Sequence, residues 1–134
     1  MSKVSVIINT FNRPYMLKQA VASVLAQTMD DWELVIAIDH RDPEHHRDLQ
    51  EGYSRDEYAT FRAVMCAVAD DDRIKVDFTD LTKGDQSLNR FAHNINRAFK
   101  LCTGDYISYL CDDDLFLPWR LSVFSRAIDE NPDF

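Results

Sequence analysis

Short apolar runs alternate along the chain with segments whose apolar residues follow helical spacing. Four runs of five or six residues, rich in β-branched side chains, predict buried strands at Val4–Asn9, Glu33–Ile38, Ile74–Phe78 and Tyr106–Leu110. Strands that alternate with helices predict an α/β fold in three layers, with a mainly parallel sheet of about four strands. No internal repeat or second domain is visible.

The first two predicted helices lie before the third strand. Asn12 suits a helix cap and Pro14 a first turn, and one apolar face follows them at Leu17, Ala20, Val21, Val24 and Leu25. Residues 40–60 are polar and predict a loop that leads into a helix over about 57–69.

Two further helices flank the fourth strand. The first has an apolar stripe at Leu88, Phe91, Ala92, Ile95, Phe99 and Cys102. Gly104, within Thr103-Gly104-Asp105, suits the end of that helix. Pro118 opens the last helix, whose apolar face is Leu121, Phe124 and Ile128.

Composition and charge exclude several classes of protein. The length of 134 residues is that of one domain, and the formal net charge of −8 argues against a nucleic-acid partner. Cys66, Cys102 and Cys111 match neither a zinc pattern nor a disulfide framework, which favours free thiols. The N-terminal apolar run is too short for a signal peptide, and no segment is long enough to cross a membrane. We therefore expect a soluble, cytoplasmic protein.

Acidic residues directly follow two predicted strands. Asp39 follows the second, and Asp112-Asp113-Asp114 follows the fourth. Ligands of open parallel sheets bind beyond the carboxyl ends of the strands. Three adjacent carboxylates repel one another, and a hard divalent cation relieves that cost, although capping of the next helix explains the run equally well. Asp70-Asp71-Asp72 precedes the third strand, so we expect a solvated turn at the opposite edge.

Several other catalytic patterns are missing from the sequence. The three glycines form neither a P-loop nor a GxGxxG motif, and no serine nucleophile elbow is present. His40, His45 and His46 match no metal-site spacing, so we expect solvated side chains in a polar loop.

Four blocks of sequence resemble the nucleotide-binding half of family 2 glycosyltransferases, which have the GT-A fold. They are VSVIINTFNRPYMLKQAVASVLAQT, DWELVIAID, NRFAHNINRAFKLCTGDYISYLCDDD and LPWRL. The blocks cover nearly the whole chain, and residues 40–73 match weakly. The resemblance implies a single Rossmann-like, nucleotide-diphospho-sugar-binding domain over residues 1–134, without the C-terminal acceptor-binding half.

The resemblance also implies roles for individual positions. Asp39 matches the acid that hydrogen-bonds the base, typically uracil, and Arg90 matches a basic residue near the base and phosphates. Asp113 and Asp114 match the metal-binding part of the DxD motif, which would take Mn²⁺ or Mg²⁺. The positions implied to bind nucleotide are Asn9, Thr10, Asn12, Asp39, Arg90 and Asp112.

Two points of the resemblance leave roles open. Many relatives have an aspartate where Cys111 stands, so which of Asp112, Asp113 and Asp114 contacts the metal is not fixed by the motif. An inverting family member also needs a general base, which normally comes from the later half of the domain. We expect it beyond Phe134 and assign no catalytic residue in this chain.

The implied activity is metal-dependent, inverting transfer of a sugar from a nucleoside-diphosphate donor, UDP-linked, to a hydroxyl of a saccharide, lipid-linked saccharide or protein. The alternative is a truncated GT-A module that binds nucleotide, or serves as an interaction domain, without turnover. A receiver-like or phosphatase-like enzyme would need an acidic pair after the first strand, where this chain has Asn9-Thr10-Phe11-Asn12. An unpaired edge beside the fourth strand also predicts a homo-oligomer.

Overall fold

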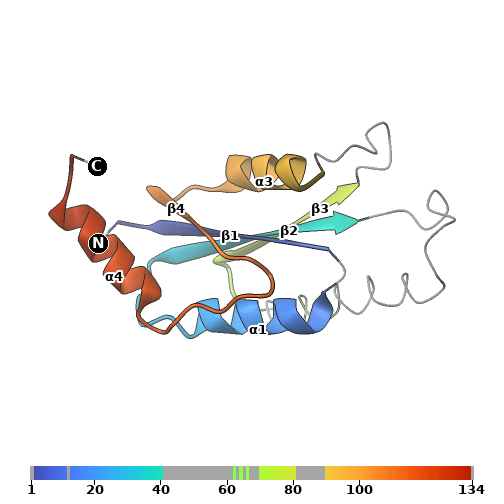
Figure 1. The fold of residues 1–134 in the computed structure, drawn as a ribbon, viewed down its shortest axis with the longest axis horizontal. Coiled ribbons are helices and arrows are strands. Elements are labelled where there is room, and N and C mark those ends of the chain that lie inside the picture. Colours follow the sequence, from blue (N-terminus) through green and yellow to red (C-terminus); the bar gives the residue numbers. More distant parts are fainter. Residues whose placement is uncertain are drawn as a thin grey trace, which may run out of the picture.

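The computed structural model describes residues 2–11, 13–40, 62, 64, 66, 70–80 and 90–133, with the backbone alone at 40, 78–80 and 90. Strands and helices alternate along this part of the chain (Figure 1). The elements are β1 (Val4–Thr10), α1 (Pro14–Leu25), β2 (Trp32–His40), β3 (Ile74–Asp80), α3 (Arg90–Leu101), β4 (Tyr106–Tyr109) and α4 (Arg120–Glu130). All four strands predicted from the apolar runs are confirmed.

The described strands form one parallel sheet. Their order is β3-β2-β1-β4, and Ile7 of β1 lies opposite Val35 of β2 and Tyr109 of β4. Pairing with β1 continues one residue beyond β4, because the Leu110 amide donates to the Ile7 carbonyl at 2.9 Å. The carboxyl ends of parallel strands meet at one edge of the sheet, so the residues that follow β1, β2 and β4 are gathered there.

Helices cover both faces of the sheet, as the predicted three-layer α/β fold requires. Figure 1 shows α1 on one face and α3 on the other. Along β1, Val6 and Ile8 belong to the large apolar cluster with α1, whereas Ile7 packs with Ala98 of α3. Successive strand residues point to opposite faces, so each apolar run supplies both cores at once.

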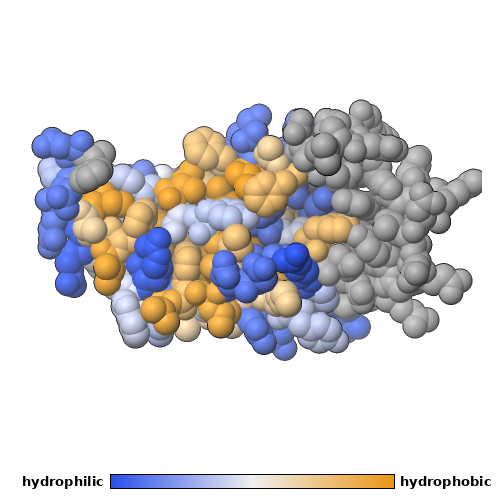
Figure 2. Space-filling view, in the orientation of Figure 1, coloured by the Kyte–Doolittle hydropathy of each residue, from blue (hydrophilic) through white to orange (hydrophobic). Residues whose placement is uncertain are grey.

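The aromatic residues of the predicted apolar stripe on α3 do not face the sheet, whereas Cys102 at the end of the stripe packs against it. Phe91 and Phe99 are 58% and 59% exposed, whereas Asn94 and Ala98 are buried. The small side chain of Ala98 lets α3 approach β1 and β2, and the aromatic rings are turned away from that contact. Figure 2 shows apolar surface over α3 and β4, where Phe91, Phe99 and Ile107 are exposed.

The helix boundaries differ slightly from those expected. Pro14 is the first residue of α1 as predicted, but the capping position belongs to Arg13, and Asn12 lies outside the described residues. The last helix starts at Arg120, two residues after Pro118. Within the predicted helix over 57–69, the described residues 62, 64 and 66 are helical. No helix in the described part of the chain has the length and apolarity to cross a membrane.

Candidate donor-binding site

The crossover helices next to β1 and β4 lie on opposite faces of the sheet. From β1 the chain crosses through α1 on one face to β2, and it reaches β4 through α3 on the other face (Figure 1). Since β1 and β4 are neighbours, the sheet has a topological switch point between them. A crevice opens at the carboxyl ends of such a strand pair, and ligands of open α/β sheets bind there.

Asp112 connects the ends of β1 and β4. Its carboxylate accepts a hydrogen bond from the Thr10 hydroxyl at 2.9 Å, and Asp112 is only 8% exposed. Arg13 also lies 3.3 Å from the Asp112 carboxylate. Both sequence-predicted residues, Thr10 and Asp112, are thus brought into direct contact across the switch point.

Arg13 is a member of the site that the sequence did not single out. Its guanidinium donates to Asp112 and to Asp113, at 3.3 Å in each case. The side chain of Arg13 is half exposed, so these ion pairs are screened by water. Arg13 supplies positive charge where three carboxylates are crowded together. The Arg-Pro pair at the start of α1 was the available signal, because it lies shortly after the end of β1.

The C-terminal part of α1 positions the segment that follows the aspartates. Gln27 donates to the Leu117 carbonyl at 2.7 Å and accepts from the Leu121 amide at 2.9 Å. The Ser23 hydroxyl accepts from the Phe116 amide at 3.1 Å. The serine and glutamine of the Ser-Val-Leu-Ala-Gln-Thr stretch therefore hold the loop between the aspartates and α4, which explains their spacing.

Three side chains after β4 form a group that fits a divalent cation. One potential ligand atom from each of Cys111, Asp113 and Asp114 lies within 4.8 Å of the other two. Carboxylate oxygens suit Mg²⁺ and Mn²⁺, and a sulfur atom suits softer divalent ions. The predicted metal residues Asp113 and Asp114 are thus neighbours in space, and the structure adds Cys111 to them.

The other predicted nucleotide residues are placed as follows. Asn9, in β1, accepts a hydrogen bond from the Tyr109 hydroxyl. Partial burial raises the pKa of Tyr109 above its ordinary value, and the neighbouring Cys111 and Asp112 add to the shift, so the hydroxyl keeps its proton. Asp39 is buried at the end of β2. The side chains of Asn12 and Arg90, and those of the three histidines at 40, 45 and 46, lie outside the described residues.

The second acidic triplet lies at the opposite edge of the sheet, as predicted. Asp71 accepts hydrogen bonds from the Arg73 backbone amide at 3.0 Å and from its guanidinium at 2.7 Å. These bonds hold the pKa of Asp71 below its ordinary value. Asp70 and Asp72 are exposed, so this triplet is a solvated turn before β3.

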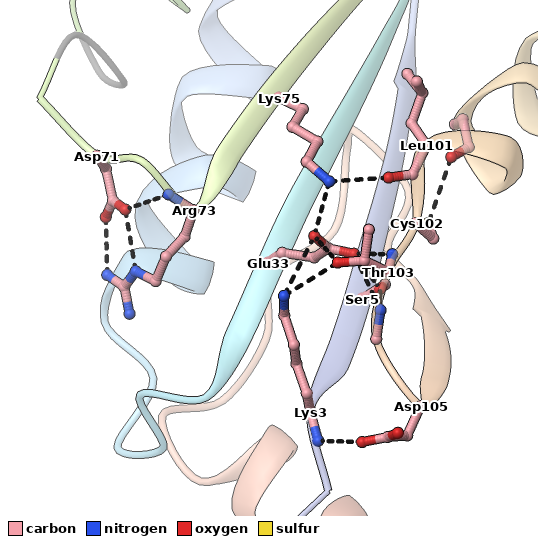
Figure 3. A network of polar contacts seen from close by, with 12 residues as sticks. Lys3, Ser5, Glu33, Asp71, Arg73, Lys75, Leu101, Cys102, Thr103 and Asp105 are labelled. Carbon is pink, nitrogen blue, oxygen red and sulfur yellow. Dashed lines mark hydrogen bonds and ion pairs between the residues drawn. The ribbon is translucent and has the colours of Figure 1, made fainter.

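Glu33 forms a buried polar network at that same edge (Figure 3), which the sequence did not indicate. Its carboxylate accepts hydrogen bonds from Ser5 at 2.6 Å and from Lys75 at 3.0 Å, as well as from the hydroxyl of Thr103 at 2.8 Å. Burial alone would raise the pKa of Glu33, but these hydrogen bonds outweigh it and lower the pKa far below its ordinary value. Glu33 thereby ties the turn between α3 and β4 to β1 and β2.

Gly104 completes this turn because no larger residue fits. A Cβ atom at Gly104 would lie 2.6 Å from the Ser5 hydroxyl oxygen and 2.8 Å from the Ser5 backbone nitrogen. The predicted helix end at Thr103-Gly104-Asp105 therefore coincides with a close approach of two backbone segments.

A comparison with protein families identifies the class of this chain. Residues 5–134 match the family described as "Glycosyl transferase family 2". The chain belongs to that family. Family membership, together with the absence of an acidic pair after β1, excludes the receiver-like and phosphatase-like interpretation.

Two curated relatives illustrate the range of this glycosyltransferase family. Protein CgeD of Bacillus subtilis is 34% identical over 98% of this chain and 27% of the relative. The GalNAc(5)-diNAcBac-PP-undecaprenol beta-1,3-glucosyltransferase of Campylobacter jejuni is 29% identical over 97% of this chain and 36% of the enzyme. The chain thus spans well under half the length of these relatives.

Solved glycosyltransferase structures share the fold. S. aureus TarS in complex with UDP superposes with a TM-score of 0.62, at 19% identity over 97% of this chain and 33% of that chain. The mannosyltransferase PcManGT from Pyrobaculum calidifontis, in complex with GDP-Man and Mn²⁺, gives 0.59 at 18% identity, over 91% of this chain and 30% of that chain. The predicted GT-A fold is confirmed.

Proposed function

We propose that this chain binds the donor of a metal-dependent, inverting glycosyltransferase, and that the donor is a UDP-linked sugar. The observation that carries the proposal is the meeting of Thr10, Arg13 and Asp112 beside the donor group of Cys111, Asp113 and Asp114 at the switch point. Structural relatives that bind UDP, or GDP-Man with Mn²⁺, support a nucleoside diphosphate at this edge.

The nucleoside would lie along the ends of β1 and β2. Asp39 offers a buried carboxylate that would accept a hydrogen bond from the uracil N–H, and Asn9 and Thr10 lie on the adjacent strand. Asp112, already fixed by Thr10, would accept a hydrogen bond from a nucleotide hydroxyl. Asn12 and Arg90 remain proposed nucleotide residues by the family pattern alone.

The diphosphate would lie over the residues that follow β4. Asp113 and Asp114 would hold Mn²⁺ or Mg²⁺, which when bound supplies positive charge to the diphosphate leaving group. Arg13 adds a second positive charge at the same place. Asp113 and Asp114 lie on the loop before α4, which Ser23 and Gln27 fix in place, so their carboxylates are oriented before the donor binds.

Transfer needs a general base that deprotonates the acceptor hydroxyl, and we assign no described residue to that role. The acceptor class, whether saccharide, lipid-linked saccharide or protein, stays open. A nucleotide-binding module without turnover would show the same donor binding and no sugar transfer, so binding is the property to test first.

Calorimetric titration of UDP into the chain, with and without Mn²⁺, tests this proposal. We expect binding in the range of about 1 μM to 1 mM that requires the ion. Asp113→Asn should abolish the ion-dependent binding of UDP, because it removes a negatively charged ligand of the ion. Asp70→Asn is the matched control, since Asp70 belongs to the acidic turn at the opposite edge. The proposal is wrong if folded protein does not bind UDP, or if both variants behave alike.

A further inference from the structure

We propose that the Cys111 sulfur is a ligand of the divalent cation, alongside Asp113 and Asp114, and that it shifts the metal preference of the site towards ions that accept sulfur. The proposal rests on the proposed location of the ion at the end of β4. It concerns a residue that the structure adds to the two predicted metal residues.

A tight turn holds the three side chains together. The Asp114 amide donates to the Cys111 carbonyl at 3.1 Å, which closes a four-residue turn from Cys111 to Asp114. Its first and last residues are therefore neighbours, and Asp113 completes the group within 4.8 Å. Two ligands of one ion, with bonds of about 2.1 and 2.3 Å, lie at most about 4.4 Å apart. Small side-chain rotations are enough to bring all three atoms onto one ion.

Asp112 does not compete for the same position. It is buried, and its carboxylate accepts a hydrogen bond from Thr10 of β1, whereas Arg13 contacts Asp112 and Asp113 equally. Within the turn, one residue is thus fixed to β1, while the other three offer ligand atoms to a common point. An ion placed there meets one sulfur and two carboxylates rather than three carboxylates.

The thiol is available for this role. Cys111 is a free cysteine of intermediate burial, and its neighbour in the crevice is the Tyr109 side chain, which is fixed by its bond to Asn9. The sulfur therefore lies beside a side chain that β1 holds in place. The other described thiols lie elsewhere: Cys102 donates to the Ala98 carbonyl near the opposite edge, and Cys66 is exposed.

A sulfur ligand changes which ions bind well. Mg²⁺ prefers an all-oxygen environment, whereas thiolate ligands favour Zn²⁺ and chemically similar ions such as Cd²⁺ and Co²⁺. We therefore expect this chain to bind Cd²⁺ and Co²⁺ more tightly, relative to Mg²⁺, than the same chain with a serine at position 111.

Titration with Cd²⁺ tests the proposal without any activity measurement, because a cadmium–sulfur bond has its own ultraviolet charge-transfer absorption. The titration uses a parent variant with Cys66→Ser and Cys102→Ser, in which Cys111 is the one remaining thiol. We expect the absorption to appear and saturate in the parent, and to be absent after Cys111→Ser. The Cd²⁺ affinity should fall by about tenfold or more in that variant, while Mg²⁺ binding is unchanged or tighter.

A second variant separates coordination at the site from binding by an isolated thiol. Asp114→Asn keeps the sulfur but removes a neighbouring carboxylate, so the absorption should survive and saturate at higher Cd²⁺ concentration. An unchanged saturation midpoint would overturn the proposal, as would Cd²⁺ binding without the absorption. If UDP binding with Mn²⁺ persists while the cadmium absorption is missing, the sulfur ligand alone is wrong. If neither UDP nor any divalent ion binds, the proposed donor site fails as well.

Discussion

Glu33 and Asp112 are both buried carboxylates, yet the chain uses them at opposite edges of the sheet. Asp112 lies at the carboxyl ends of the strands, where Thr10 and Arg13 bind it. Glu33 lies at the amino ends, where a serine, a threonine and Lys75 surround it (Figure 3). Position along parallel strands therefore separates a carboxylate that holds the fold together from one at the candidate site.

Replacing Glu33 with glutamine should destabilise the protein by about 3 kcal/mol, because it removes one partner of a buried charged network. The folded pKa of Glu33 is lowered, so its contribution is fully present above the ordinary value of 4.5 and is lost as the pH falls below it. The stability difference between the two proteins should therefore stay constant from pH 7 down to the ordinary pKa of 4.5 and shrink below it.

Urea unfolding at several pH values measures this difference. The exposed Asp72→Asn serves as control and should change stability by less than about 0.5 kcal/mol. A Glu33→Gln penalty that stays constant through the acid range would show that the charge of Glu33 is not the stabilising property.

Individual site residues were predictable from the sequence only where a strand end marked them. The two acidic triplets have the same composition, and their positions before β3 and after β4 assigned them to different edges correctly. Arg13 and Glu33 were not predicted. Arg13 and Asp112 lie 99 positions apart in the chain, and Glu33 is a polar residue at the start of an otherwise apolar run. Contacts of this kind depend on register, which a sequence pattern does not encode.

At the scale of elements, β-strands were predicted better than the orientation of helices. A strand buried on both faces is apolar throughout, so its burial can be read from composition alone. A helix buries one face, and α3 offers two candidates: an aromatic stripe containing Phe91 and Phe99, and a small-residue face containing Ala98. The sheet selects the second, because the narrow space above β1 and β2 admits alanine.

This orientation of α3 predicts that substitutions at two adjacent positions, 98 and 99, change the stability of the protein by different amounts. Ala98→Leu should destabilise the protein by about 1–3 kcal/mol, because added methyl groups have no space against Ile7 and Val35. Phe99→Ala should cost less than about 1 kcal/mol, since most of that ring is exposed. Thermal or urea unfolding of the two variants decides between the faces. A larger penalty at Phe99 than at Ala98 would restore the orientation expected from the aromatic stripe.

At the scale of the whole molecule, the described residues form a parallel sheet whose two edges, at the amino ends and the carboxyl ends of the strands, differ in character. The edge at the amino ends of the strands carries the Glu33 network. It is also contacted by α4, where the Ser125 hydroxyl donates to the Ser2 carbonyl. The edge at the carboxyl ends of the strands carries the charged residues of the candidate site. One outer strand, β4, leaves Ile107 and Tyr109 partly exposed, so self-association through this edge remains a prediction that light scattering can check.

The central claim is that a nucleoside diphosphate binds at the carboxyl ends of β1, β2 and β4. Titration of ¹⁵N-labelled protein with UDP and Mg²⁺, followed by amide chemical shifts, tests it most directly. We predict shifts at Asn9–Phe11, Arg13, Asp39 and Cys111–Asp114, and none at Asp71–Arg73 or Thr103–Asp105. Shifts concentrated at the amino edge, or no shifts in a folded protein with millimolar UDP, would contradict the account.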